Sequence, residues 1–516
     1  MPLAEKGDAR AQHNLGFLYS RDGIEQNYKE AAKWFQKAAE QGLAESQLLL
    51  GAMYDDGGMG VAQEYWQARK WYRKAAEQGN LEALVAMGTV YAEGKGLSQN
   101  LEEAVVWYRK AAEQNYAGAQ ILMGRAYAKG EGVTQDIKEA VVWYRKAAEQ
   151  GNTIAQIMMA LAYEQGEGVT EDYKEANNWW RNAAEQGHAN AQYKLGMMYD
   201  DGQGVVQDYK QAVQWYRKAA EQGEAGAQYN LGVMYYLGQG VAQDDLQAAM
   251  WFRKAAEQGS VKAQYNLGVM YDDGQGVVQD NKPAAMWFRK AAEQGSVKAQ
   301  YNLGVKYNLG QGVAQDYKQA VDWFRKAAEQ GLAQAQYNLG LMYVEGKGVV
   351  QDYKQAVDWF RKAAEQGHAK AQYNLGVAYD NGQGVVQDYK QAVKLYRNAA
   401  EQGHANAQYN LGVMYVEGKG VAQNYKEAIK LFLKSAEQGM KAAQAKLGLQ
   451  YTLGNGLVVD NLKGYMWLDI SLSSEHEFKE LATKTKDMLE ETLSAEQLAV
   501  AKEFAKDCVR KNYKGC

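Results

Sequence analysis

The stretch Ala263-Gln-Tyr-Asn-Leu-Gly-Val-Met-Tyr-Asp-Asp-Gly-Gln-Gly-Val277, followed by Trp287-Phe-Arg-Lys-Ala-Ala-Glu-Gln-Gly295, decides the fold. The following 36 residues restate the phrase from Ala299 to Gly331. A fixed period of this length indicates a stack of identical supersecondary units, so one unit explains the whole architecture. The period also favours a binding function, because a stack forms a long surface rather than a single pocket.

The glycine that closes each Glu-Gln-Gly phrase marks the ends of the units. The first two units differ slightly in length from the rest, and the last is divergent, which is typical of capping repeats. Thirteen units result, with starts near residues 8, 43, 80, 116, 152, 188, 224, 260, 296, 332, 368, 404 and 440.

Each unit is predicted to be a hairpin of two helices. In residues 262–272 apolar side chains recur at spacings of three and four, which indicates an amphipathic helix, here named helix A. Gly274 suits a left-handed helix end, and Asp280 is placed to cap the next helix, helix B. Helix B carries Trp287 on its buried stripe, and Gly268 permits close approach of the two helices. We therefore predict an all-α fold, an α/α right-handed superhelical solenoid of about thirteen 36-residue hairpins.

The composition fits this fold and excludes several classes of partner. Two prolines in 516 residues favour helix nearly everywhere. The net charge of −4, with both signs interleaved, gives no basic stripe for nucleic acid and no polybasic run for an anionic membrane. No apolar run is long enough for membrane insertion.

The termini bear on the compartment. Met1-Pro-Leu-Ala-Glu-Lys does not resemble a signal peptide, but Leu3–Gly7 reads as the tail of a preceding helix, so we expect the chain to begin inside a repeat. The two cysteines, Cys508 and Cys516, are either idle thiols or a small disulfide that pins the C-terminus. A disulfide favours an oxidising compartment, and the expected location is the bacterial periplasm or the medium, otherwise the cytoplasm.

The recurrent residues resemble the Sel-one-like repeat (SLR) family, relatives of the tetratricopeptide repeats. The resemblance rests on Leu267-Gly268, Tyr271, Gly274-x-Gly276-Val277, Trp287-Phe288 and the alanines and glycine that follow, repeated over about residues 8–474. It implies a scaffold or adaptor that is not an enzyme and binds a protein or peptide on helix A of the concave face. The segment Ala495–Ala505, preceded by Ser494, resembles the capping helix of bacterial members. We thus expect a solenoid over residues 1–474 and a helical cap and tail over 475–516.

The repeated phrase also contains a Tyr-Asn pair before Leu-Gly, and the packing of the helices is not expected to require this pair. Carboxamides offer one acceptor and two donors, which suits a peptide backbone of any sequence, and tyrosine is a favoured interface anchor. Alternatively, the pair arose by duplication, and its asparagines form hydrogen bonds with each other or with the ends of helices. The predicted peptide-binding residues are Tyr229, Asn230, Tyr265, Asn266, Tyr301, Asn302, Tyr337, Asn338, Tyr373, Asn374, Tyr409 and Asn410.

Other chemistry is not indicated by the sequence. The glycine loops follow a helix and lack the Lys-Ser/Thr of a phosphate loop, and the five histidines are spaced too widely for one metal site. We predict no catalytic residue, no metal and no cofactor. A binder of glycan or peptidoglycan in a bacterial envelope stays open as the alternative, and a hydrolase is the weakest one. The oligomeric state is left open.

Overall fold

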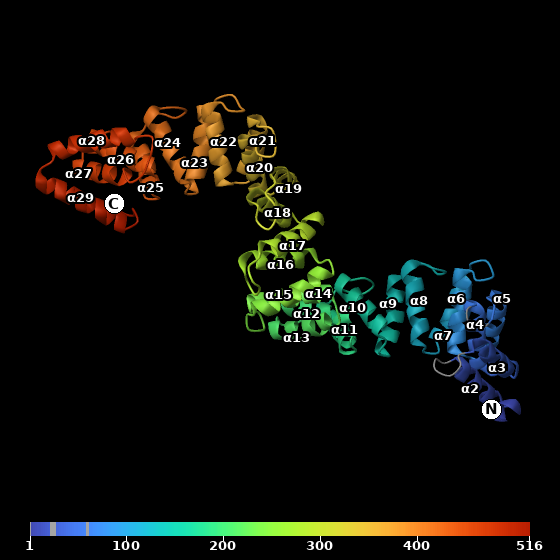
Figure 1. Cartoon of the computed structure of the whole chain (residues 1–516). Helices are drawn as coiled ribbons and strands as arrows, with labels where there is room; N and C mark the ends of the chain where they lie inside the picture. The colour runs from blue at the N-terminus through green and yellow to red at the C-terminus, as the bar shows by residue number, and fades with distance from the viewer. Residues whose placement is uncertain (1, 21–26, 58–60) are drawn as a thin grey trace. The chain divides into compact units, whose positions relative to one another are not determined.

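The computed structural model describes residues 2–20, 27–57 and 61–516. Across these ranges the chain forms 29 helices and no strand. Two compact units divide it, Met1–Ser260 and Val261–Cys516, and the division falls between two repeats. In each unit, consecutive helices pack as hairpins and each hairpin packs on the next (Figure 1). The predicted all-α repeat architecture is confirmed.

Unit 1 begins with the short helix α1 (Pro2–Glu5) and continues with seven repeats. Its A helices are α2 (Ala9–Ser20), α4 (Ala44–Asp56), α6 (Leu81–Glu93), α8 (Ala117–Lys129), α10 (Thr153–Gln165), α12 (Ala189–Asp201) and α14 (Ala225–Leu237). Its B helices are α3 (Tyr28–Glu40), α5 (Tyr65–Glu77), α7 (Leu101–Ala112), α9 (Ile137–Glu149), α11 (Tyr173–Glu185), α13 (Tyr209–Glu221) and α15 (Asp245–Glu257).

Unit 2 holds six repeats and two further helices, α28 (Lys479–Thr492) and α29 (Ala495–Arg510). Its A helices are α16 (Val261–Asp273), α18 (Val297–Leu309), α20 (Ala333–Glu345), α22 (Ala369–Asn381), α24 (Ala405–Glu417) and α26 (Lys441–Leu453). Its B helices are α17 (Asn281–Glu293), α19 (Tyr317–Glu329), α21 (Tyr353–Glu365), α23 (Tyr389–Glu401), α25 (Tyr425–Ala436) and α27 (Asn461–Ser471).

The local signals in the sequence act as predicted. A Cβ atom on Gly268 would lie 2.7 Å from the ring of Phe288, so glycine is what lets helix A meet the aromatic side chain of helix B. Gly274 ends α16 with a φ of +74°, where an L side chain is strained. Asp280 caps α17 by accepting a hydrogen bond from the amide of Lys282 at 2.9 Å.

Two polar contacts that the sequence analysis did not anticipate join successive repeats. Buried Gln300 of α18 donates from Nε2 to the carbonyl oxygen of Ala292 in α17 (3.2 Å) and accepts at Oε1 from Gln330 at the end of α19 (2.8 Å). Arg289 of α17 donates to the hydroxyl of Tyr307 in α18 at 2.7 Å. The glutamine contacts recur at Gln47, Gln120, Gln156, Gln192, Gln228, Gln336, Gln372 and Gln408.

We call this three-helix contact the glutamine relay. It ties the end of one helix B to both helices of the next repeat, because a carboxamide donates and accepts at once. The relay also includes α1: Gln12 of α2 donates to the carbonyl oxygen of Ala4 at 3.0 Å and accepts from Gln41 at 2.7 Å. Helix α1 thus takes the place that the end of helix B has in the later repeats.

The last two helices close unit 2. Ser494 caps α29 through a reciprocal pair of hydrogen bonds with Gln497. The apolar faces of α28 and α29 bury Leu489 and Ala501 in a cluster with Leu468 of α27. Ser471, which replaces an alanine of the repeat phrase, is fully buried at this junction.

Candidate peptide-binding face

Five Tyr-Asn pairs lie on successive A helices of unit 2, and we call their surface the Tyr-Asn face. It consists of Tyr265, Asn266, Tyr301, Asn302, Tyr337, Asn338, Tyr373, Asn374, Tyr409 and Asn410. All of these side chains are half-buried except that of Tyr409, which is buried. The sixth pair, Tyr229 and Asn230, lies on α14 of unit 1 and is half-buried as well.

The tyrosine rings take part in packing, which the sequence analysis did not expect of them. Each ring lies against an aromatic ring of helix B in its own repeat, as Tyr301 does against Phe324 at 5.9 Å between centroids. The other pairs have centroid separations between 5.7 and 6.0 Å, namely Tyr229–Phe252, Tyr265–Phe288, Tyr337–Phe360, Tyr373–Tyr396 and Tyr409–Phe432. The tyrosines therefore fix the A helices as well as forming their surface.

The hydroxyl groups of three tyrosines bond to asparagines of the next repeat: Tyr265 to Asn302, Tyr337 to Asn374 and Tyr373 to Asn410. Burial raises the pKa of each of these phenols, while the hydrogen bond with asparagine lowers the pKa. A bond that favours the phenolate is one in which the amide N–H donates to the phenol oxygen. At least one N–H of each carboxamide is thereby used in a contact with the preceding repeat.

Two asparagines also bond to tyrosines of helix B. The phenol of Tyr396 donates to the carboxylate of Asp380 at 3.2 Å and is bonded to Asn410. Its pKa is raised, mainly by burial and then by the nearby Asp380. In unit 1 the same arrangement joins Tyr216 to Asp200, at 3.0 Å, and to Asn230. These contacts hold the amides in fixed orientations.

The face ends where the C-terminal segment covers it. The hydroxyl of Tyr409 donates to the carboxylate of Glu477, and the Tyr409 side chain is only 7% exposed. Lys446 of α26 stands where earlier repeats have asparagine, and its ammonium lies 4.0 Å from the centroid of the Phe478 ring. Burial lowers the pKa of Lys446. The four pairs on α16, α18, α20 and α22 are therefore the accessible part of the face.

Histidines border the face. His368 and His404 cap α22 and α24 by accepting at Nδ1 from the amides of Ala371 (3.2 Å) and Ala407 (3.3 Å). His368 also packs on Tyr337, with centroids 4.9 Å apart, and His404 stacks on Tyr373 at 4.8 Å. Burial, and then the charge of Lys370, lowers the pKa of both imidazoles. Within the described ranges no three potential ligand side chains come together as a metal site.

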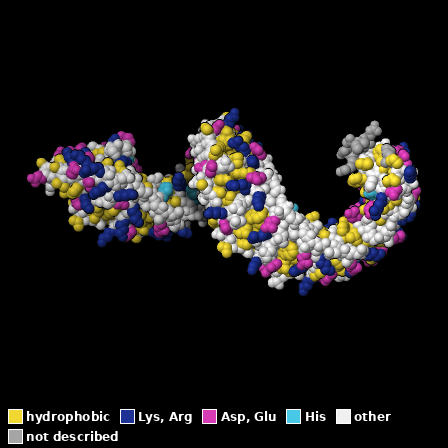
Figure 2. Space-filling view, turned by 90° about the horizontal axis from the view of Figure 1, so that it is seen from below, with side chains coloured by type: hydrophobic (Ala, Val, Ile, Leu, Met, Phe, Trp, Pro, Cys, Tyr) yellow, Lys and Arg dark blue, Asp and Glu magenta, His cyan; other side chains and the backbone are white. Residues whose placement is uncertain are grey.

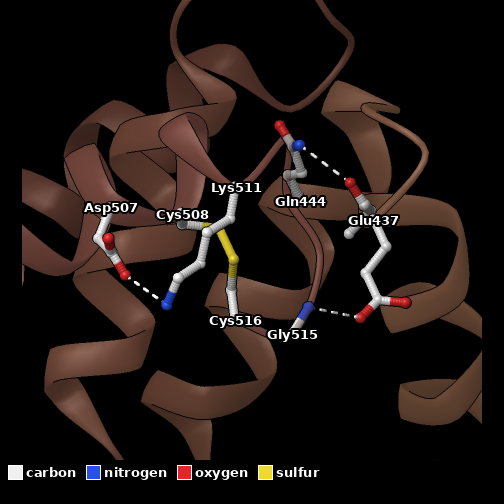
Figure 3. The surroundings of a disulfide bond; sticks show 8 residues. Glu437, Gln444, Asp507, Cys508, Lys511, Gly515 and Cys516 are labelled. Carbon is white, nitrogen blue, oxygen red and sulfur yellow. Dashed lines mark hydrogen bonds and ion pairs between the residues drawn. A yellow bond between two sulfur atoms is a disulfide. The ribbon is translucent and has the colours of Figure 1, made fainter.

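The structure joins Cys508 of α29 to Cys516 in a disulfide (Figure 3). The closed loop lies against the end of α25, where the amide of Gly515 donates to the Glu437 carboxylate at 3.3 Å. An ion pair of Lys511 with Asp507, at 2.6 Å, lies beside it. The disulfide thus holds the tail on the last two repeats.

Charges of both signs are scattered over the visible surface among apolar side chains, without a large patch of one sign (Figure 2). No described helix is both long and apolar enough to span a bilayer.

Stacked helix hairpins with a repeated polar face define a helical repeat protein. The Sel1 repeat matches thirteen consecutive segments of the chain, which therefore belongs to the Sel1 repeat family, as predicted. The matched residues are 9–43, 44–80, 81–116, 117–152, 153–188, 189–224, 225–260, 261–296, 297–332, 333–368, 369–404, 405–440 and 441–474. Sel1 repeat proteins are in general helical scaffolds for protein interaction without enzymatic activity.

The solved structures that are similar to the chain include the following two. One is a protective antigen of uropathogenic Escherichia coli strains that displays an SLR fold, with 36% identity over 93% of this chain and 96% of that one, and a TM-score of 0.66. The other is a Sel1 repeat protein from Oxalobacter formigenes, with 35% identity over 62% of this chain and 91% of that one, and a TM-score of 0.49. The comparison with curated proteins returned no significant match.

Proposed function

We propose that the chain is a non-enzymatic scaffold that binds an extended segment of a partner protein along the Tyr-Asn face of unit 2. The observation that carries the proposal is the pair of carboxamides at Asn302 and Asn374 on the accessible part of the face, each bonded to a tyrosine of the preceding repeat. Their remaining donors and acceptors match the N–H and C=O groups of a peptide backbone. Rigid tyrosine rings beside them add apolar contact area at little entropic cost.

A peptide array tests the proposal with the full-length protein. The probe is a library of acetylated and amidated decapeptides, and the variant is Asn302→Ala/Asn338→Ala/Asn374→Ala, which keeps every tyrosine ring and its packing. We expect the variant to lose at least about tenfold in affinity for all bound peptides, since each lost hydrogen bond contributes about 1 kcal/mol. Asn381→Ala, at the exposed end of α22, is the matched control. Unchanged affinity in a folded triple variant contradicts the proposal.

A glycan array probed with the same full-length protein tests the alternative of glycan binding. If the wild-type protein binds a glycan array and no peptide, the scaffold reading fails and a glycan-binding face replaces it. The disulfide between Cys508 and Cys516 supports a location in an oxidising compartment, the bacterial periplasm or the medium. Cell fractionation followed by non-reducing mass spectrometry of the native protein tests that location.

A further inference from the structure

One position of helix A varies along unit 2 although it is buried. It lies three residues after the Leu-Gly leucine and is held by Met270, Lys306, Met342, Ala378 and Met414. Met342 packs against Val321 and Phe324 of the preceding helix B, and Ala378 packs against the equivalent Val357 and Phe360. The methionine side chain therefore fills the space between one helix B and the next helix A.

Alanine leaves that space open. Ala378 lacks the Cγ, Sδ and Cε atoms of methionine, and a cavity of about 140 Å³ lies beside it. Its walls are mainly apolar and come from Leu341, Val344, Val357, Phe360 and Val377. Apolar cavities of about 150 Å³ are large enough to bind small apolar molecules such as benzene.

The cavity also reaches the Tyr-Asn face. Asn374, whose carboxamide is bonded to Tyr337 of the preceding repeat, is one of its lining residues. Backbone recognition by that amide and an apolar recess are therefore next to each other in a single repeat. In an extended peptide successive side chains alternate in direction, so one side chain can enter the recess while the backbone stays at the amide.

A second cavity, of about 340 Å³, occupies the equivalent place in unit 1 beside Ala126, which holds the same position in α8. It differs in two respects. Its lining includes the charged side chains of Glu93, Arg125 and Glu131, and Leu122 stands where Asn374 stands in unit 2. The unit 1 cavity thus has a more polar lining and no asparagine at the position of Asn374, which makes it a matched control.

We propose that the cavity at Ala378 receives one aliphatic side chain, methionine or leucine, of the peptide bound on the Tyr-Asn face; the inference rests on the function proposed above. The chain itself indicates the occupant, because its own Met342 and Met414 fill this space in the adjoining repeats. The Tyr-Asn face would bind backbones of any sequence, and this recess gives it a preference for one side chain at one position.

The test fills the recess with the residue that its neighbours carry. The variants are Ala378→Met and, as control, Ala126→Met, both in the full-length protein, and the probe is a positional-scanning library of acetylated and amidated decapeptides. For the wild type we expect one position at which methionine or leucine binds at least about tenfold tighter than alanine, as burial of such a side chain implies. Ala378→Met is expected to reduce that preference to less than about threefold, and Ala126→Met to leave it unchanged.

The outcomes separate this inference from the proposed function. If peptides bind without a side-chain preference, or if the preference survives in Ala378→Met, the recess is not a side-chain site. The proposed binding of peptides to the Tyr-Asn face is unaffected by that result. If no peptide binds the wild type, both are overturned. A thermal midpoint for Ala378→Met at or above that of the wild type shows that the variant folds, since methionine already fits this space in two adjoining repeats.

Discussion

The ammonium of Lys306 pairs with the carboxylate of Asp272 in the preceding repeat, at a position where adjoining repeats bury methionine. The Lys306 side chain is 4% exposed, and it also donates to Asn281 at 2.7 Å and to Gln311 at 3.3 Å. A buried ammonium is tolerated only when it is paired and hydrogen-bonded, so these partners explain how lysine replaces an apolar residue here.

Removal of the carboxylate is therefore predicted to cost more than removal of the whole pair. Asp272→Ala leaves a buried charge, and we expect a loss of about 2–3 kcal/mol, at the low end for buried pairs because Asp272 is one-third exposed. Lys306→Met restores the residue of the neighbouring repeats and should change stability by less than about 1 kcal/mol. Hydrogen exchange of the α18 amides measures both. Equal losses of stability in Asp272→Ala and Lys306→Met would show that the two side chains are not energetically coupled.

The glutamine relay is predicted to contribute to the coupling between repeats. Gln300→Leu removes a donor and an acceptor at once and leaves the carbonyl of Ala292 and the amide of Gln330 without this partner. We expect the local free energy of opening of α18 and α19 to fall by about 1–3 kcal/mol. Hydrogen exchange of the amides in these two helices measures this change. Gln319→Ala, at an exposed site on α19, is the control and should change it by less than about 0.5 kcal/mol. A neutral Gln300→Leu variant would assign the coupling to apolar packing alone.

Stability is predicted to fall on acidification through His368 and His404. Their pKa values are lowered in the folded state, so the unfolded chain binds protons more readily and the folded state loses stability as pH drops. Their contribution is complete above about pH 6.5, the ordinary histidine pKa, and is lost as pH falls through the lower folded values.

The matched variant is His368→Asn/His404→Asn, because Asn152 caps α10 from the same position without a titratable group. Thermal midpoints measured from neutral to mildly acidic pH should fall less in this variant than in the wild type. Parallel curves would mean that other groups cause the acid sensitivity.

The disulfide is predicted to hold the tail without supporting the repeats. Its ends are eight residues apart, and the chain-entropy estimate for so short a loop is about 2–3 kcal/mol. In Cys508→Ser/Cys516→Ser we expect faster hydrogen exchange at residues 509–516 and at the contact of Gly515 with Glu437, and unchanged exchange in α16–α24. Loss of protection throughout unit 2 would give the disulfide a global role instead.

Periodicity made the fold predictable. The helices, the left-handed Gly274, the Asp280 cap and the close approach at Gly268 each follow from local chemistry that needs only the residue and its spacing. The glutamine relay was missed for the opposite reason. The glutamines equivalent to Gln264 and to Gln294 each recur in twelve of the thirteen units, but a search for apolar stripes discards polar residues, and their partners lie in different helices.

The Tyr-Asn pair was predicted as surface only. Tyr337 is an example of what a helical wheel does not show, because its ring packs on Phe360 while its hydroxyl reaches Asn374 of the next repeat. Those contacts depend on how two hairpins stack, and one unit read alone does not contain the second. The recess at Ala378 does have a signal in the sequence, because Ala378 occupies the position that Met342 and Met414 occupy in the flanking repeats.

The glutamine relay affects how the number of repeats can change during evolution. Every junction in it uses the same positions of two successive repeats, so loss or duplication of one 36-residue segment between equivalent positions brings together a donor and an acceptor that already match. Length can therefore change by whole repeats without any new interface having to evolve. What such an event alters is the order of the variable residues, such as Lys306 and Ala378, along the surface.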